Sequence, residues 1–135
     1  MIIGIGIDSV EIKRFSDWVN HPAEKLKKIF SEQEIQHCLK SKPNTAERFA
    51  ARFAVREAFF KALSHIMPGN TIPFLTACKS VAIEHEENGN PNLTVDWDSL
   101  AKKYGIAIRG NLQTFISLTH TSNTATALVI VENRQ

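Results

Sequence analysis

The sequence has few of the residues that mark membrane, disulfide-rich or nucleic-acid-binding proteins. Its two cysteines, Cys38 and Cys78, form no CxxC pair and have no metal-ligand spacing, so we expect two free thiols. No apolar run approaches the ~20 residues of a membrane span, and the N-terminus lacks the basic flank and long apolar segment of a signal peptide. A net charge of +2 is too small to indicate nucleic acid. We therefore expect a cytoplasmic protein that binds neither nucleic acid nor membrane.

Length and composition indicate an ordinary globular chain. Of the 135 residues, 43% are hydrophobic and 22% are charged, which suits one hydrophobic core. We find no internal repeat, no low-complexity tract and no linker. The sequence therefore predicts a single domain spanning residues 1–135.

The charges are unevenly distributed along the chain. Residues 13–28 contain five basic and two acidic side chains, a local excess of +3, whereas residues 80–100 contain five acidic side chains and no Lys or Arg. Such asymmetry either steers a charged partner or is ordinary surface variation. The sequence alone leaves both interpretations open.

Hydrophobic periodicity and turn signals predict an α+β fold. Ser31 and Glu34 form a capping box at the start of one helix, and Asn88-Gly89 is a strong turn signal. Strands at both ends of the chain with helices between them are typical of α+β folds. The expected strands cover residues 2–7, 81–84, 93–97, 114–120 and 124–131, and the expected helices cover 11–19, 31–39, 44–65 and 98–104.

The helix over residues 44–65 has an unusual mixture of aromatic and charged side chains. Arg48, Arg52 and Arg56 recur every fourth residue and so share a face, and Glu57 and Lys61 form a second pair at the same spacing. This pattern indicates either a phosphate site with a metal beside it or a solvated face with one ordinary Glu–Lys pair. Spacing alone does not separate the two.

Asp8 follows a short apolar run, where a carboxylate is a poor choice for filling a core. It either caps a following helix or binds a metal. If the first strand packs on the central helix, Asp8 and Glu57 converge. Two carboxylates are typical of Mg²⁺, which retains several waters and also binds substrate phosphates. His120, at the end of an alternating strand, is either structural or a phosphate contact among the hydroxyls of Ser117, Thr119 and Thr121.

Four segments of the chain, in order, resemble the motifs of one enzyme family. Gly4-Ile-Gly-Ile-Asp8 with Glu11 and Arg14-Phe15 is similar to the opening motif of holo-[acyl-carrier-protein] synthases. The segment from Arg52 to Ala62 resembles the central motif of that family. Asn88-Gly89-x-Pro91 and Ser117-x-Thr119-His120-Thr121 match the third and fourth motifs. Each match is weak alone, but the ordered set covers nearly the whole chain.

The resemblance implies a fold and an activity. Such enzymes have a small antiparallel sheet packed against a long central helix, and they assemble as homotrimers with active sites between subunits. They transfer 4′-phosphopantetheine from coenzyme A to a serine of apo-acyl carrier protein, with Mg²⁺, and release adenosine 3′,5′-bisphosphate. By resemblance, Asp8 and Glu57 bind the metal. They act in catalysis with Lys61, which would lie near the reacting phosphate as a candidate proton acceptor.

The remaining roles also come from the resemblance. Arg52, Arg56, Lys61 and Lys42 would contact coenzyme A phosphates. Gly89 and Pro91 would shape the adenine pocket. His120 and Thr121 would meet the 3′-phosphate or ribose, and Arg14 would bind the acidic carrier protein.

Arg56 departs from the family, which usually has Lys at this position. Arg cannot accept a proton at ordinary pH, so the sequence argues for a phosphate contact there and against a base. Two other functions stay open at this point: a coenzyme A-binding module without transfer activity, and a trimeric interaction domain. Asp8 together with Glu57 favours the enzyme, because simple phosphate binding does not need two carboxylates.

Overall fold

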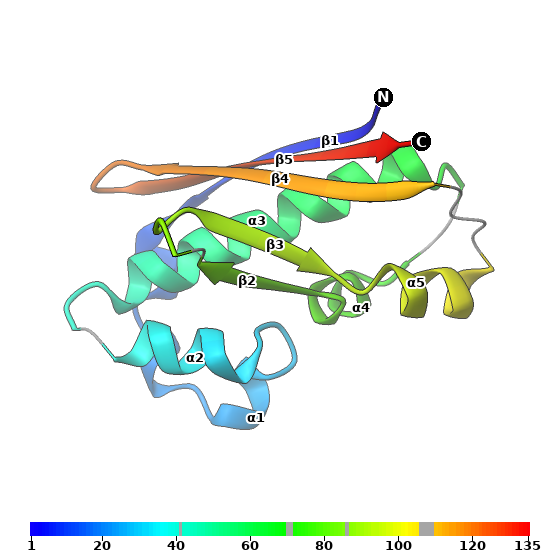
Figure 1. The fold of residues 1–135 in the computed structure, drawn as a ribbon. Coiled ribbons are helices and arrows are strands. Elements are labelled where there is room, and N and C mark those ends of the chain that lie inside the picture. The colour runs from blue at the N-terminus through cyan, green and yellow to red at the C-terminus, as the bar shows by residue number, and fades with distance from the viewer. Residues whose placement is uncertain (41, 70–71, 86, 106–109) are drawn as a thin grey trace.

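The structure, a computed structural model, describes residues 1–40, 42–69, 72–85, 87–105 and 110–135 (Figure 1). Its strands pack against a long central helix, as the sequence predicts for an α+β fold. The elements, in chain order, are β1 (Ile2–Glu11), the 3₁₀ turns η1 (Ile12–Phe15) and η2 (Trp18–Asn20), α1 (Ala23–Leu26), α2 (Glu32–Leu39), α3 (Thr45–Ile66), α4 (Phe74–Lys79), β2 (Val81–His85), β3 (Pro91–Val95), α5 (Trp97–Tyr104), β4 (Asn111–His120) and β5 (Thr124–Arg134).

A three-stranded antiparallel sheet with the order β1-β5-β4 covers one side of α3 (Figure 1). The central strand β5 alternates strictly, because successive side chains point to opposite faces of a sheet. Its inward side chains are fully buried and face α3; they are Ala125, Ala127, Val129 and Val131. The alternation predicted for β4 and β5 is therefore confirmed, although both strands run further than expected.

Two glycines let β1 lie directly on α3. A Cβ added to Gly6 would overlap the carbonyl oxygen of Ala58, and one added to Gly4 would lie 2.8 Å from the carbonyl oxygen of Ala62. Glycine in a strand often marks such a close approach of another backbone. The apolar run of β1 thus brings the next polar residue, Asp8, onto the surface of α3.

The helix α3 is buried over most of its circumference. Phe49, Phe53 and Phe59 are at most 5% exposed, whereas Phe60 is half-buried and packs edge-on against Phe74. Most helices bury only one stripe, and a helix enclosed on nearly all sides forces its polar side chains to find partners inside the protein. This is why Arg52 and Arg56 do not lie on a solvated face.

A second, two-stranded sheet is formed by the hairpin of β2 and β3, which pairs Val81 with Val95 and His85 with Pro91. Gly89 has a φ of +84° in the turn, and the side chain of Asn88 accepts a hydrogen bond from the backbone of Asn90 at 2.9 Å. Both features confirm the predicted Asn-Gly turn. In Figure 1 the turns of β2–β3 and β4–β5 lie at the same end of the molecule as the start of α3.

Several expectations differ from the structure. The helix predicted over residues 11–19 is two 3₁₀ turns, because Ile12, Phe15 and Trp18 recur every third residue, the 3₁₀ period. The strand predicted over 93–97 ends at Val95, since Asp96 caps α5. The helices α1 and α4 had not been predicted, and β1 ends at Glu11 and not at residue 7. Asp8 lies inside β1 and caps no helix, so the capping interpretation is wrong.

No helix among the described residues is long and apolar enough to span a membrane.

Candidate active site

Asp8 and Lys61 meet where β1 crosses α3. The Lys61 ammonium lies 3.0 Å from Oδ1 of Asp8 and donates to the backbone oxygen of Ile7 at 2.9 Å. The Asp8 side chain is 16% exposed and the Lys61 side chain is 53% exposed, so the pair opens to solvent on the lysine side. The close packing permitted by Gly6 makes this contact possible, because it lets Lys61 reach the free edge of β1.

Glu57 precedes Lys61 by one helical turn and shares its electrostatic environment. Burial, and then the charge of Asp8, raise the pKa of Glu57 above its ordinary value, while Lys61 and Arg14 act in the opposite direction. Two carboxylates that repel one another beside solvent are a suitable place for a cation. The structure therefore brings Asp8, Glu57, Lys61 and Arg14 together, as the sequence reasoning expected of the first three.

The donor set at this point suits a hard divalent cation. Asp8 and Glu57 supply only carboxylate oxygens, and Mg²⁺ binds through one or two carboxylates with waters and substrate phosphates completing its shell. Within the described ranges no group of three or more His, Cys, Asp or Glu side chains could hold a metal ion. The chemistry present thus fits Mg²⁺ and does not fit a metal held entirely by protein ligands.

A second group of charged side chains lies between α2, α3 and β2, and we call it the arginine–histidine cluster: His37, Arg48, Arg52 and His85. Arg52 is 6% exposed and donates to the backbone oxygen of Arg48 at 3.3 Å and to Nε2 of His85 at 3.4 Å. Its Nε has no hydrogen-bond partner among the described residues. The rings of His37 and His85 lie 5.4 Å apart.

Positive charge is concentrated in the arginine–histidine cluster. Burial lowers the pKa of His37, and Arg52, Arg48, His85 and Lys40 lower it further. Among the described residues, no ion pair neutralises Arg48 or Arg52, so the cluster is suited to an anion. Sequence reasoning had named only Arg52 as a phosphate ligand in this cluster. His37 and His85 lie on elements far apart in sequence, so no spacing pattern could have found them.

The prediction that Arg56 contacts a phosphate is wrong. Its side chain is 0% exposed, and a guanidinium nitrogen lies 2.7 Å from a carboxylate oxygen of Glu34. Further guanidinium nitrogens donate to the backbone oxygens of Cys78 and Val81, each at 3.2 Å. The partner of Arg56 is therefore Glu34. Arg56 is enclosed by α2, α4 and β2 and cannot reach a ligand at the surface.

His120 is the last residue of β4 and Thr121 follows it, near the start of α3. Nε2 of His120 lies 3.2 Å from a carboxylate oxygen of Glu47, and its Nδ1 lies 3.3 Å from the backbone oxygen of Thr121. The Thr121 hydroxyl accepts from the backbone amides of Asn123 and Thr124 at 3.2 and 3.1 Å. The side chain of His120 is 54% exposed, so it is held by Glu47 but is still open to a ligand. The sequence reasoning had not identified Glu47.

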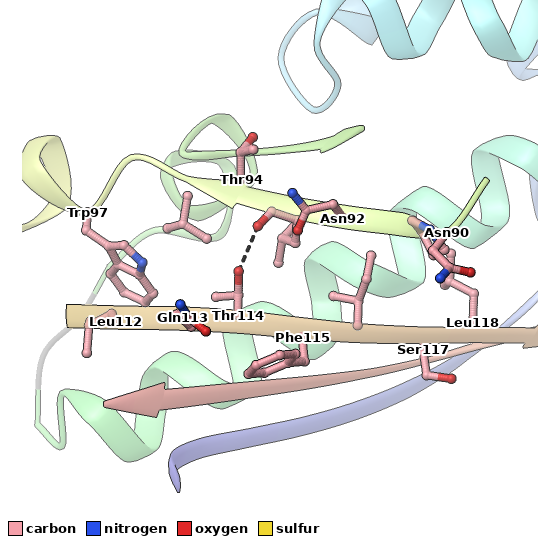
Figure 2. A pocket seen from close by; sticks show the side chains of 14 residues that line it. Asn90, Asn92, Thr94, Trp97, Leu112, Gln113, Thr114, Phe115, Ser117 and Leu118 are labelled. Atoms are coloured by element: carbon pink, nitrogen blue, oxygen red, sulfur yellow. Dashed lines mark hydrogen bonds between the residues drawn. The ribbon is translucent and has the colours of Figure 1, made fainter. Parts of the chain in front are cut away.

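The remaining predicted residues are at or near the surface. Lys42 is exposed in the turn before α3, and Gly89 is exposed in the β2–β3 turn. Pro91 lines a groove of about 900 Å³ between β3 and β4. Figure 2 shows Asn90, Ser117 and Leu118 at one end of this groove and Trp97 and Leu112 at the other. Among the described residues, no hydrogen bond or ion pair joins Lys42, Gly89 or Pro91 to Asp8 or Glu57.

Arg14 lies on η1, where its charge acts on Glu57. Its guanidinium carbon stands 5.0 Å from the ring centroid of Phe53 and 5.6 Å from that of Phe15. Cation–π contacts of this kind hold an arginine while leaving its hydrogen-bond donors free. The exposed Arg14 is therefore presented next to Glu57.

Comparison with known proteins identifies this arrangement. Residues 4–128 match the family model described as the 4′-phosphopantetheinyl transferase superfamily. The chain is 33% identical to a holo-[acyl-carrier-protein] synthase of Treponema denticola (98% of this chain, 99% of that protein) and 36% identical to one of Halothermothrix orenii (98% of each). A solved complex of an acyl carrier protein synthase from Chronobacterium ammoniagenes with coenzyme A superimposes with a TM-score of 0.77 at 26% identity and covers 97% of both chains. The chain thus belongs to the 4′-phosphopantetheinyl transferase superfamily, as an enzyme of the holo-[acyl-carrier-protein] synthase type.

Proposed function

We propose that one domain, residues 1–135, transfers 4′-phosphopantetheine from coenzyme A to a serine of an apo-acyl carrier protein in the cytoplasm. The reaction requires Mg²⁺ and releases adenosine 3′,5′-bisphosphate. The observation that carries this proposal is the meeting of Asp8, Glu57 and Lys61 at the crossing of β1 and α3. Two carboxylates and an ammonium at the surface suit a metal–diphosphate complex, which a simple anion site would not require.

Asp8 and Glu57 would hold the Mg²⁺. Bound there, the metal would neutralise the charge that develops on the leaving adenosine bisphosphate. The pKa of Glu57 is raised first by burial and then by Asp8; this supports the assignment, because a bound cation favours the charged form of both carboxylates. The positions of both side chains follow from the glycine-permitted packing of β1 on α3.

Lys61 is better suited to donate hydrogen bonds than to accept the serine proton. Its ammonium already donates to Asp8 and to the backbone oxygen of Ile7, and a protonated amine has no lone pair. Its remaining donor hydrogen is available to a phosphate oxygen of coenzyme A. In this role Lys61 orients Asp8 and stabilises charge in the transition state, the main contribution that a protein makes to phosphoryl-type transfer.

The arginine–histidine cluster supplies a second phosphate contact. Arg52 and the neighbouring exposed His85 would bind a phosphate of coenzyme A as a charge-assisted pair. Lys42, His120 and Thr121 lie around the start of α3 and would complete the adenosine end of the site, while Gly89 and Pro91 shape the adenine pocket. The diphosphate and the 3′-phosphate of coenzyme A would thus bind to different positively charged side chains.

The acidic carrier protein would dock on the basic surface around Arg14. Residues 13–28 carry a local excess of +3, and Arg14 is exposed beside Glu57. Charge complementarity at this surface would steer the carrier serine toward the diphosphate.

A homotrimer is supported by the outer face of the three-stranded sheet. Ile5 is 47% exposed, Ile7 is 60% exposed and Phe115 is 46% exposed. The strand register places Ile5, Ile130 and Phe115 in one row across this face. A contiguous exposed apolar row of this kind is typical of an interaction surface, and by family resemblance its occupant is another copy of the chain.

One assay tests the proposed function. The protein is incubated with coenzyme A, Mg²⁺ and apo-acyl carrier protein, and the carrier is weighed by mass spectrometry. We expect a mass gain of one phosphopantetheine arm that depends on Mg²⁺, together with free adenosine 3′,5′-bisphosphate. Binding of coenzyme A without a mass gain would instead indicate a binding module, and absence of both would indicate an interaction domain.

A further inference from the structure

The free edge of β2 is covered by charged side chains from two helices and not by another strand. The backbone oxygen of Val81 accepts a hydrogen bond from Arg56 at 3.2 Å, and the backbone amide of Ile83 donates to a carboxylate oxygen of Glu34. In an antiparallel pair, alternate residues turn their backbone groups away from the partner strand. Val81 and Ile83 are such residues, so Arg56 and Glu34 supply the donor and acceptor that a neighbouring strand would supply.

This ion pair is almost completely enclosed. The Arg56 and Glu34 side chains are 0% and 2% exposed, and 2.7 Å separates their charged atoms. Arg56 also donates to the backbone oxygens of Cys78 and Arg52, so that α2, α3, α4 and β2 are joined at one point. Removing two charges from water is costly, and an apolar pair of similar volume is often at least as stabilising. A geometric role explains such a pair better than a contribution to stability.

The hairpin that Arg56 and Glu34 hold is the element that carries the proposed adenine-binding turn. His85, two residues beyond Ile83, contacts Arg52 in the arginine–histidine cluster. The opposite edge of the hairpin, β3, faces β4. Among the described residues, one hydrogen bond joins these two strands, from the Thr114 hydroxyl to the backbone oxygen of Leu93 at 2.7 Å (Figure 2). On the side of β2, the spacing between the hairpin and α3 is set by Arg56 and Glu34, while β3 packs on β4 on the other side.

We propose that Arg56 and Glu34 are positioning residues for coenzyme A binding: they fix the β2–β3 hairpin on α3 and thereby place His85 and the turn at Gly89 and Pro91. Neither side chain touches the substrate. The inference rests on the proposed function of that site, and it gives Arg56 a role that replaces the phosphate contact expected from the sequence.

The test begins with Arg56→Lys, which keeps the charge but cannot donate to the backbone oxygens of Cys78 and Val81 and to Glu34 together. We expect the KM for coenzyme A to rise about fivefold or more. The kcat should stay within about twofold and the KM for the carrier protein should not change, because Asp8, Glu57 and Lys61 are untouched. Val131→Ala, in the core beneath the sheet, is the control. It should lower Tm without changing the KM for coenzyme A.

A double variant separates positioning from stability. In Glu34→Met with Arg56→Met, both buried charges are gone, so Tm should recover relative to either single substitution. The backbone groups of Val81 and Ile83 lose their partners, so the KM for coenzyme A should stay raised. Hydrogen exchange should be faster in residues 81–85 than in the wild type and unchanged in residues 45–66.

Two results would overturn the proposal. One is a wild-type KM for coenzyme A in Arg56→Lys. The other is a double variant that recovers Tm and KM together, which would make the pair purely structural. Failure of the proposed function is a different result: the wild-type protein would leave apo-carrier protein unmodified in the presence of coenzyme A and Mg²⁺.

Discussion

The Lys61 ammonium lies 3.0 Å from the carboxylate of Asp8, across 53 residues of sequence. This contact exists because Gly4 and Gly6 allow β1 to touch the backbone of α3. The same packing places Glu57 within the electrostatic influence of Asp8. The proposed metal site is thus a consequence of how closely one strand packs on one helix.

Removing either carboxylate should abolish the proposed reaction without unfolding the protein. We expect Asp8→Asn and Glu57→Gln to lower kcat by about 10²-fold or more, because each removes charge that stabilises the transition state. Asp98→Asn, at an exposed position of α5, is the matched control and should keep wild-type activity. If either site variant keeps near-normal turnover at saturating Mg²⁺, the assignment of Asp8 and Glu57 as metal ligands is wrong.

Glu57 should make stability depend on pH. Its folded-state pKa is raised above the ordinary value of 4.5, so its contribution to stability is complete below about that pH and is lost as pH rises through the raised pKa. Glu57→Gln should therefore have a higher Tm than the wild type at pH 7, and the difference should vanish below about pH 4. Thermal unfolding across this range measures it. Saturating Mg²⁺ should reduce the difference in Tm between Glu57→Gln and the wild type at pH 7. If the two proteins have the same Tm at pH 7 without Mg²⁺, the charge of Glu57 does not destabilise the fold.

Gly6 should tolerate no side chain. In Gly6→Ala the new methyl group overlaps the backbone oxygen of Ala58, so β1 must shift away from α3. We expect a loss of about 1–3 kcal/mol in the free energy of unfolding and a raised Mg²⁺ requirement. Gly4→Ala meets a less severe contact and should cost less. Denaturant unfolding measures the two losses in unfolding free energy. If Gly4→Ala loses as much as Gly6→Ala or more, close backbone packing does not determine where β1 crosses α3.

Reversing Arg14 should affect the carrier protein alone. Arg14→Glu places a negative charge on the proposed docking surface, so the KM for acyl carrier protein should rise about tenfold or more while the KM for coenzyme A is unchanged. Lys102→Glu changes an exposed charge on α5 and serves as the control. If both variants raise the carrier KM equally, net charge and not the Arg14 surface determines docking.

The exposed apolar row should hold the assembly together. Phe115→Asp puts a charge into the row formed with Ile5 and Ile130, so light scattering should change from a trimer to a monomer at micromolar concentration. Leu75→Asp, 48% exposed on α4, controls for loss of any exposed apolar side chain and should remain trimeric. A monomeric wild type would refute the trimer directly.

Local features of the sequence predicted most of the secondary structure. Ser31 caps α2 by accepting from the backbone of Glu34 at 3.2 Å, as the capping box indicates. The long helix begins and ends within one residue of the expected bounds, because Pro68-Gly69 and the polar turn before Thr45 are strong local signals. The helix α4 was missed because it is only six residues long and follows a segment without clear periodicity.

By itself the sequence determined the order of the motifs, the strand alternation, and the choice of Asp8 and Glu57 as candidate metal ligands. Spacing along α3 also fixed which side chains share a face. It could not fix what lies opposite that face, so Arg56 was expected at a phosphate. Only the tertiary structure decided that Arg56 pairs with Glu34 and Lys61 with Asp8. The physical reason is that a buried charge must find its partner among whichever elements enclose it, and those elements come from distant parts of the chain.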